Sequence, residues 1–98
     1  MFPFVRPNQI LVRLPAQLLP LSGGARTVKV EAGTVDEVFT VLRGRFPALV
    51  QAVLTENGSV RLHVNVFVNR GDIRMLDRGR TELHAGDVMT VLPSITGG

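Results

Sequence analysis

Residues 34–42 read Thr-Val-Asp-Glu-Val-Phe-Thr-Val-Leu, and this stretch predicts the best-specified element of the chain. The Thr34 hydroxyl can accept a hydrogen bond from the amide of Glu37, and the Glu37 carboxylate can reach back to the Thr34 amide, as in a capping box that starts a helix. Apolar residues then recur at helical spacing and predict one buried stripe, formed by Val35, Val38, Phe39 and Leu42. We expect the helix to end at Gly44, because glycine commonly follows the last helical turn.

Strand patterns lie on both sides of this helix. Residues 9–14 and 26–31 are short β-rich runs that predict an N-terminal hairpin, with residues 15–24 as its long connection. Residues 60–69 alternate between apolar and polar side chains and form the clearest strand. Its aliphatic face is predicted to lie in the core and comprises Leu62, Val64, Val66 and Val68. Phe67 then falls on the opposite, polar face.

The remaining elements follow from local signals. Pro47 suits the first position of a second, shorter helix, which carries Leu49, Val50, Val53 and Leu54. Turns are expected at residues 57–58, 70–72 and 85–87. The last strand covers residues 88–92 and stops at Pro93, which cannot donate to a ladder. In this strand Met89 and Val91 should point inward and Leu92 outward.

This order of hairpin, helix, strands and final strand predicts an α+β fold in which a mixed sheet packs on one main helix. The first and last strands should pair in parallel at the centre, which is the β-grasp arrangement. We therefore expect a flexible leader at residues 1–8, one β-grasp domain at 9–93 and a flexible tail at 94–98. Because the helix covers one sheet face, the other face stays open to a partner, with Phe67 and Leu92 as its predicted exposed docking patch.

Composition excludes several classes of protein. The 98 residues suffice for one domain, and the absence of cysteine rules out disulfides, thiolate metal ligands and thiol catalysis. His63 and His84 lie far apart without further ligands at metal spacing, and no serine is placed with a histidine as a nucleophile would be, so we predict neither a metal site nor an active site. No apolar run reaches the ~18–20 residues that span a bilayer. Without a signal-peptide pattern at residues 1–7, a cytoplasmic location is expected.

The charge pattern argues against nucleic acid as the main partner. The net charge is +3, and Lys29 is the only lysine among 11 basic residues. The arginines are scattered along the chain and become dense only within residues 70–80, where Asp72 and Asp77 lie among them. A solvated face, or docking to an acidic protein, fits this mixture better than a basic stripe that follows a phosphate backbone.

The chain ends in Gly97-Gly98 directly after the last predicted strand. Beyond a β-grasp domain, this ending points to chemistry at the C-terminal carboxylate of Gly98. A carboxylate is a poor electrophile, so it must be activated, usually as an acyl-adenylate, by an enzyme that threads it through a narrow channel to ATP. Two residues without Cβ pass where others clash. Since the chain has no cysteine, any sulfur chemistry would have to use another attachment point, such as a C-terminal thiocarboxylate.

Three segments carry a resemblance to a known family. Residues 87–98, Asp-Val-Met-Thr-Val-Leu-Pro-Ser-Ile-Thr-Gly-Gly, resemble the ending shared by the molybdopterin-synthase small subunit and the thiamine-pathway sulfur carrier. Residues 14–24, and Val-Asn-Val-Phe-Val-Asn at 64–69 with Asp-Ile-Arg at 72–74, resemble more closely the sulfur carrier of the thiocarboxylate-dependent cysteine pathway. The resemblance spans residues 9–98. One departure is Arg70-Gly71, where the cysteine-pathway carriers are acidic, which leaves branch and partner charge open.

The resemblance implies a ubiquitin-like carrier that is not itself an enzyme and holds no permanent cofactor. An E1-like enzyme would adenylate Gly98 with ATP, and a sulfur donor would convert the AMP ester to a thiocarboxylate for a sulfur-accepting synthase. In the cysteine branch that synthase uses pyridoxal phosphate, and a zinc metalloprotease releases the cysteine. The reaction site would then comprise Gly97 and Gly98. The partner-binding residues would be Phe67, Leu92, Pro93, Ile95 and Thr96.

Three alternatives remain open at this point. The sulfur could be destined for molybdopterin or thiamine instead of cysteine. The chain could be a protein modifier that is conjugated to a target lysine through Gly98. It could also be a basic β-grasp module that binds RNA, with the tail incidental. Steeply salt-dependent RNA binding by the isolated domain would support this third alternative.

Overall fold

The computed structural model describes residues 8–93. Residues 1–7 and 94–98 lie outside the described part, and so do the predictions made for Ile95, Thr96, Gly97 and Gly98. The strands are β1 (Gln9–Arg13), β2 (Thr27–Glu31), β3 (Val64–Val68), β4 (Gly71–Asp72) and β5 (Val88–Pro93). The helices are α1 (Val35–Arg45) and α2 (Pro47–Val53), and short 3-10 turns cover Ala16–Leu21, Ile73–Met75 and Arg78–Arg80.

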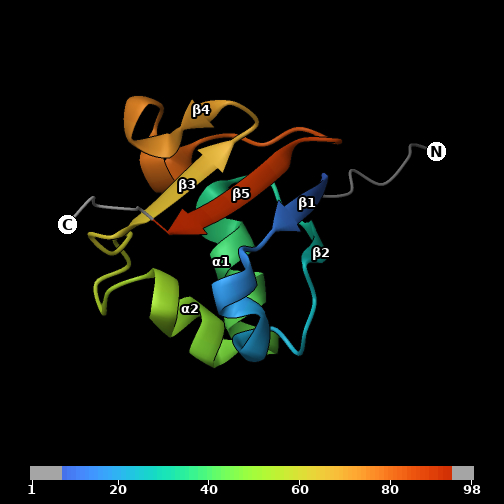
Figure 1. The fold of residues 1–98 in the computed structure, drawn as a ribbon. Coiled ribbons are helices and arrows are strands. Elements are labelled where there is room, and N and C mark those ends of the chain that lie inside the picture. Colours follow the sequence, from blue (N-terminus) through green and yellow to red (C-terminus); the bar gives the residue numbers. More distant parts are fainter. Residues whose placement is uncertain (1–7, 94–98) are drawn as a thin grey trace.

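The five strands form one mixed sheet in the order β2-β1-β5-β3-β4. At its centre β1 and β5 run parallel, while the other neighbouring strands pair antiparallel. In Figure 1, α1 lies behind the central strands and α2 follows below it. The predicted α+β architecture is therefore confirmed, with a mixed sheet packed on one main helix and the first and last strands parallel at the centre.

The start of α1 follows the predicted cap with one change. Thr34 Oγ1 accepts from the Glu37 amide at 3.2 Å, as predicted. The Glu37 carboxylate, however, accepts from the Gly33 amide at 2.7 Å and not from Thr34. Gly33 is held there because its carbonyl accepts from the Leu83 amide at 2.9 Å. The cap therefore joins the helix start to the segment before β5.

The end of α1 lies beyond the predicted one. The helix runs through Gly44 to Arg45, so the predicted end at Gly44 is wrong. Gly44 is exposed, and a side chain there would meet no atom within 4 Å, so nothing at this position interrupts the helix. The end comes at Phe46, with φ −139° and ψ 73°, because Pro47 disfavours helical backbone in the residue before it. Pro47 then starts α2, as predicted.

The core lies between α1, α2 and the sheet. The predicted helix stripe is buried, namely Val35, Val38, Phe39 and Leu42. From the sheet, Val66, Val68, Met89 and Val91 are buried as predicted. Val64 is only partly buried, and it packs against the edge of this cluster. Burial on this scale supplies most of the driving force for folding.

Leu62 does not belong to this core. Its side chain is 82% exposed, so its predicted place on the buried face is wrong. The strand begins only at Val64, because its amide donates to the Arg61 carbonyl at 3.1 Å in a turn that precedes β3. Val60, at the predicted start of the strand, instead pairs with Leu54 in an isolated bridge. The residues before β3 therefore break the alternation that the sequence suggests.

The turns agree with the sequence except after β3. There the chain turns at Asn69 and Arg70, one residue earlier than predicted, because Gly71 and Asp72 already pair back with β3. Asn69 has a φ of 54°, a left-handed conformation that Asn adopts more readily than most residues. The predicted turn before β5 is present, with Gly86 at a φ of 90°.

The first described residue is already tied into the domain. The Asn8 carbonyl accepts from the Ala32 amide at 2.8 Å, and the Asn8 side-chain amide donates to the Leu83 carbonyl. Asn8 thus lies within the domain, although the sequence places it in the leader. Within residues 8–93, no helix is long and apolar enough to cross a membrane.

Candidate functional site

Cross-strand pairing defines the sheet face that α1 leaves uncovered. Val66 and Val91 pair directly and are buried on the side of α1, so their strand neighbours point to the other face. We call the following residues at the centre of that other face the open face: Leu11, Arg13, Asn65, Phe67, Val88, Thr90 and Leu92. The open face combines apolar side chains with two small polar ones and one arginine, a mixture that is found in protein-docking surfaces.

The two predicted docking residues share the open face. Phe67 lies opposite Thr90 and Leu92 lies opposite Asn65, so Phe67 and Leu92 are diagonal neighbours, a relation that spans ~7–8 Å. Leu92 is 43% exposed, whereas Phe67 is half-buried, so less of the Phe67 ring is available than the sequence suggests.

The last described residue marks where the tail continues. Pro93 ends β5 opposite Val64 and is half-buried. The structure thus places Phe67 and Leu92 on one face of the sheet. Pro93 follows Leu92 at the end of β5, whereas Phe67 lies farther back along this strand pair, opposite Thr90. Ile95, Thr96, Gly97 and Gly98 lie outside the described residues, so their predicted roles stay predictions.

Arg74 is a residue that the sequence analysis does not single out as part of the site. Its Nη2 donates to the Val64 carbonyl at 2.7 Å, and its Nη1 donates to Asn65 Oδ1 at 2.7 Å. Asp72 Oδ2 lies 3.7 Å from the same Nη1. The available signal was the Asp-Ile-Arg match at residues 72–74, although residue types alone do not show where this side chain points.

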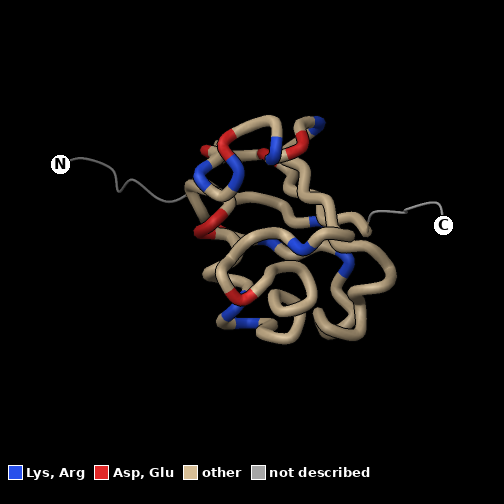
Figure 2. Tube along the Cα trace, turned by 90° about the vertical axis from the view of Figure 1, so that its left-hand side faces the viewer, with Lys and Arg blue, Asp and Glu red and all other residues tan. Residues whose placement is uncertain are grey.

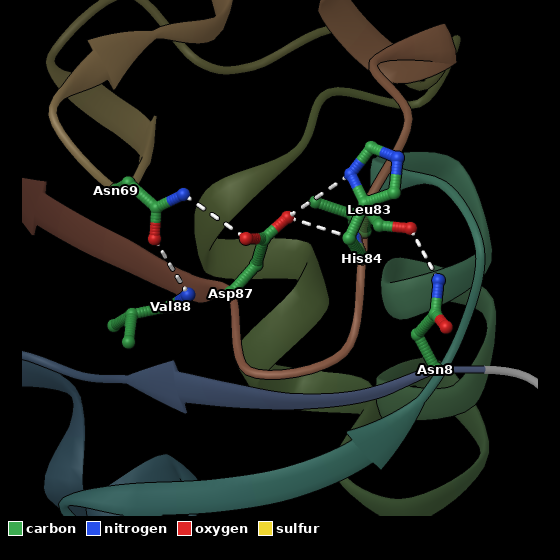
Figure 3. A network of polar contacts seen from close by, with 6 residues as sticks. All are labelled: Asn8, Asn69, Leu83, His84, Asp87 and Val88. Atoms are coloured by element: carbon green, nitrogen blue, oxygen red, sulfur yellow. Dashed lines mark hydrogen bonds and ion pairs between the residues drawn. The ribbon is translucent and has the colours of Figure 1, made fainter.

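A polar cluster lies at the start of β5 (Figure 3). Asn69 Nδ2 donates to Asp87 Oδ1 at 3.1 Å, and Asn69 Oδ1 accepts from the Val88 amide at 3.0 Å. The other oxygen, Asp87 Oδ2, accepts from the His84 amide at 2.8 Å and lies 3.8 Å from His84 Nδ1. Figure 3 also shows Asn8 bound to the Leu83 carbonyl beside this cluster. The cluster connects three segments at one end of the sheet: the residue before β1, the residue after β3 and the turn that leads into β5.

The Asp87 carboxyl is tuned by its surroundings. Burial raises its pKa, but hydrogen bonds from the His84 amide and from Asn69, together with the nearby charge of His84, lower the pKa by more. Its net pKa lies below the ordinary value, so Asp87 is ionised at neutral pH. A carboxylate held by amide donors, with no nucleophile among its contacts, is suited to fixing a turn and not to acid–base catalysis.

Charge and metal chemistry add no second site. Among residues 8–93, no group of three His, Cys, Asp or Glu side chains could hold a metal ion. At the top of Figure 2, near β4 in Figure 1, positions of both signs alternate along the chain. Interspersed charges of this kind do not form a continuous basic track.

A cavity of about 180 Å³ lies between the start of α1 and the segments before and after β3. Its lining combines apolar side chains, among them Val35, Phe39 and Ile73, with the two arginines Arg74 and Arg78. Small-molecule sites usually enclose ~300–1,000 Å³. The cavity is thus too small for a typical organic cofactor.

The sheet, the helix and the open face beside the base of a Gly-Gly tail define a ubiquitin-like β-grasp protein. The chain belongs to the ThiS family, whose sequence model matches residues 12–98. It is 29% identical over 91 residues to the sulfur carrier protein CysO of Mycobacterium tuberculosis, a match that covers 91% of this chain and 98% of that protein.

Solved structures give the same picture. The crystal structure of the Amycolatopsis orientalis BexX/CysO complex matches with a TM-score of 0.81 and 29% identity, over 91% of this chain and 99% of the matched one. The crystal structure of SAMP1 from Haloferax volcanii matches with a TM-score of 0.76 and 29% identity, over 93% and 100% of the two chains. The relatives are small carriers and modifiers, and the curated CysO match is a carrier rather than a catalyst.

Proposed function

We propose that this chain is a sulfur carrier whose Gly98 carboxylate is adenylated by an E1-like enzyme and then converted to a thiocarboxylate. The observation that carries the proposal is the Gly97-Gly98 ending in a ThiS-family domain. Gly98 lies five residues after Pro93, which is the last residue of β5. Similarity to the sulfur carrier CysO over nearly the whole chain supports it. The chain acts as a substrate of its partners and not as an enzyme.

Loading takes two steps at the same carboxyl group, that of Gly98. The Gly98 carboxylate attacks the α-phosphate of ATP, which releases pyrophosphate and leaves an AMP ester. Hydrosulfide, HS⁻, released by the sulfur donor then attacks the acyl carbon, and AMP departs with one of the original carboxylate oxygens. The sulfur loses its proton to solvent, which leaves the thiocarboxylate. The AMP ester and the thiocarboxylate are therefore transient modifications of the chain, and no permanently bound cofactor is needed.

The open face provides the docking surface in this proposal. Phe67 and Leu92 would contact the partner first, because a few residues near the centre of an interface supply most of the binding energy and aromatic side chains are enriched there. Pro93, Ile95 and Thr96 would follow as the tail enters the active site. The absence of Cβ atoms at Gly97 and Gly98 would admit the carboxylate through a narrow channel. The similar CysO structure from Amycolatopsis orientalis is a complex with BexX, which supports a protein partner for this chain.

Cysteine is the proposed destination of the sulfur. The similarity to CysO proteins favours this branch over molybdopterin and thiamine. A pyridoxal-phosphate cysteine synthase would then be the sulfur acceptor, and a zinc metalloprotease would release the product. Because activation consumes ATP, the proposal places the chain in the cytoplasm.

The decisive experiment weighs the intact protein after incubation with ATP, the activating enzyme and a sulfur donor. Loading should add the mass of one oxygen-to-sulfur exchange, with the AMP ester accumulating when the donor is omitted. A variant without Gly98 is the matched control and should gain neither modification. Equal loading of both proteins would refute the proposal that Gly98 is the modified residue.

A second candidate is a protein modifier that is joined through Gly98 to lysines of other proteins. The similarity to small archaeal modifier protein 3 of Haloferax volcanii, 35% identical over 65 residues, favours it. That match covers 66% of this chain and 70% of the archaeal protein. Mass spectrometry of the cellular protein separates the two functions: a carrier shows the sulfur exchange, whereas a modifier appears in larger covalent adducts.

A further inference from the structure

The chain leaves the sheet at the pair Val64–Pro93, where β5 ends. On the other side of β3, no strand among residues 8–93 pairs with its first half, because β4 pairs only with Phe67 and Val68. An open strand edge exposes backbone groups that need partners and is a weak point of a sheet. The part of β3 that supports the base of the tail would therefore be held from one side alone.

Arg74 occupies the place of the missing strand neighbour. Its guanidinium donates to the Val64 carbonyl and to Asn65 Oδ1, both at 2.7 Å. Charge-assisted bonds from a planar guanidinium to two acceptors fix the direction of each. The acceptors belong to consecutive residues of β3, and these two residues lie opposite Pro93 and Leu92.

Asp72 holds Arg74 at both ends. Asp72 Oδ1 accepts from the Arg74 backbone amide at 2.8 Å, while Asp72 Oδ2 lies 3.7 Å from Arg74 Nη1. The backbone and the guanidinium of Arg74 are thus oriented by one carboxylate. Although the Arg74 side chain is 41% exposed, its charged end is committed to contacts within the domain.

We propose that Arg74 is a positioning residue that fixes the site from which the C-terminal tail leaves the domain. This inference rests on the proposed carrier function. Arg74 holds Val64 and Asn65, and through their pairing it holds Leu92 and Pro93. Because Leu92 also lies on the open face, a docked partner meets the tail base in a fixed position. A fixed base raises the chance that Gly98 reaches the ATP site after docking.

The experiment compares Arg74→Ala, Arg74→Lys and the control Arg70→Ala in the full chain. Arg70 lies in the turn at the other end of β3, is exposed, and has no side-chain hydrogen bond or ion pair within residues 8–93. The control removes the same charge from the same segment. The first readout is hydrogen exchange of the Leu92 amide. Arg74→Ala should accelerate it at least about tenfold, while Arg70→Ala leaves it unchanged.

The second readout is the kinetics of adenylation. Arg74→Ala should lower kcat about tenfold at a nearly unchanged KM, because docking through the open face is preserved while delivery of the carboxylate is impaired. Arg74→Lys should fall between the wild type and Arg74→Ala, since an ammonium is a single point charge that cannot bond both acceptors in the same plane.

Several outcomes would overturn the inference. Unchanged Leu92 exchange in Arg74→Ala would show that Arg74 does not hold the tail base. Faster exchange of the Leu92 amide with an unchanged kcat would show that adenylation does not require a fixed tail base. A raised KM with unchanged exchange would show that Arg74 contacts the partner directly. If Arg74→Ala failed to fold, Asp72→Ala, which removes the carboxylate that orients Arg74, would be measured in its place. A wild type that is never adenylated would refute the carrier function, while the exchange result would still decide whether Arg74 holds the base.

Discussion

The Asn69 side chain fastens the end of β3 to Asp87, just before β5: Asn69 Nδ2 donates to Asp87 Oδ1 at 3.1 Å. Asn69 also accepts from the Val88 amide through its side chain and donates to the Val88 carbonyl through its backbone at 2.7 Å. Both residues belong to the segments that resemble the sulfur carriers. We infer that they serve the fold, because they fix the first residue of β5, whose last residue is the base of the tail.

Two substitutions at Asn69 separate its backbone role from its side-chain role. Asn69→Gly keeps the left-handed backbone available but removes the bonds to Asp87 and Val88. Asn69→Ala removes the same bonds but keeps a Cβ at a φ of 54°. The alanine variant should lose more free energy of unfolding than the glycine variant, by ~1 kcal/mol. Urea denaturation of both variants measures the difference, and equal stability would show that the φ at this turn costs nothing.

The ionisation of Asp87 should appear in the acid stability of the domain. Because the pKa of this carboxyl is lower in the folded chain, its contribution is fully present above the unfolded value, ~3.9, and is lost as the pH falls through the folded pKa. Asp87→Asn cannot titrate, so its free energy of unfolding should fall less steeply below about pH 4 than that of the wild type. Denaturation at a series of pH values tests this, and parallel pH curves would contradict the lowered pKa.

The sequence predicts the fold well where one residue pattern has one local solution. The capping residue Thr34 and the apolar stripe of α1 specify a helix whatever surrounds them. The predictions fail at Gly44 and at Leu62, where other residues determine the backbone conformation. Helix α1 passes through Gly44 because the stop comes from Pro47, and Leu62 leaves the core because Val60 pairs with Leu54. Alternation alone cannot show that pairing.

The candidate site is only partly predictable for a similar reason. Leu92 follows from strand parity, so its place on the open face could be expected. Arg74 could not, because its contacts depend on the short length of β4, which leaves the edge of β3 uncovered. Counting residues does not show how many pairs a hairpin forms. A residue of the 3-10 turn after β4, here Arg74, that fills a missing pairing position becomes visible only in three dimensions.

The buried stripe of α1 gives the clearest stability test. Phe39 is 4% exposed and packs in the main core cluster. Phe39→Ala should reduce the free energy of unfolding by ~3–5 kcal/mol, the range for emptying a buried aromatic site. Chemical denaturation measures this loss. Thr40→Ala on the exposed side of the same helix is the matched control, and a loss below ~1 kcal/mol for Phe39→Ala would contradict the packing.

The open face can be tested at Leu92 without disturbing the core. Leu92→Glu places a charge on a side chain that is 43% exposed, so the domain should remain folded. Binding to the activating enzyme should weaken by ~2 kcal/mol or more if Leu92 is a main contact. Calorimetric titration measures this, with Leu62→Glu as a control at an exposed leucine outside the open face. Phe67→Glu should weaken binding too, although its half-buried ring adds a cost in stability. Unaltered affinity with both Phe67 and Leu92 changed would exclude the open face as the docking surface.

The length of the tail is the strictest requirement of the proposed function. Deleting Gly98 moves the terminal carboxylate back by one residue, ~3.3–3.6 Å along an extended chain. A displacement of this size exceeds what a nucleophile in contact with the α-phosphate of ATP can tolerate. Both adenylation and sulfur loading should therefore be lost, while stability in urea stays that of the wild type. An extra residue after Gly98 should block loading in the same way unless a protease first removes it.

The width of the channel is tested separately by Gly97→Val. This variant keeps the length and the terminal glycine but adds a β-branched side chain, which is both bulky and restricted in its backbone conformation. It should fold normally, bind the activating enzyme through the open face, and fail to become adenylated. Intact-mass analysis after incubation with ATP reports the AMP ester directly. Ser94→Val, which introduces the same side chain at a tail residue outside the proposed binding residues, serves as the control. Normal adenylation of Gly97→Val would show that residue 97 passes no narrow channel. A narrow channel would then not explain why the chain ends in two glycines.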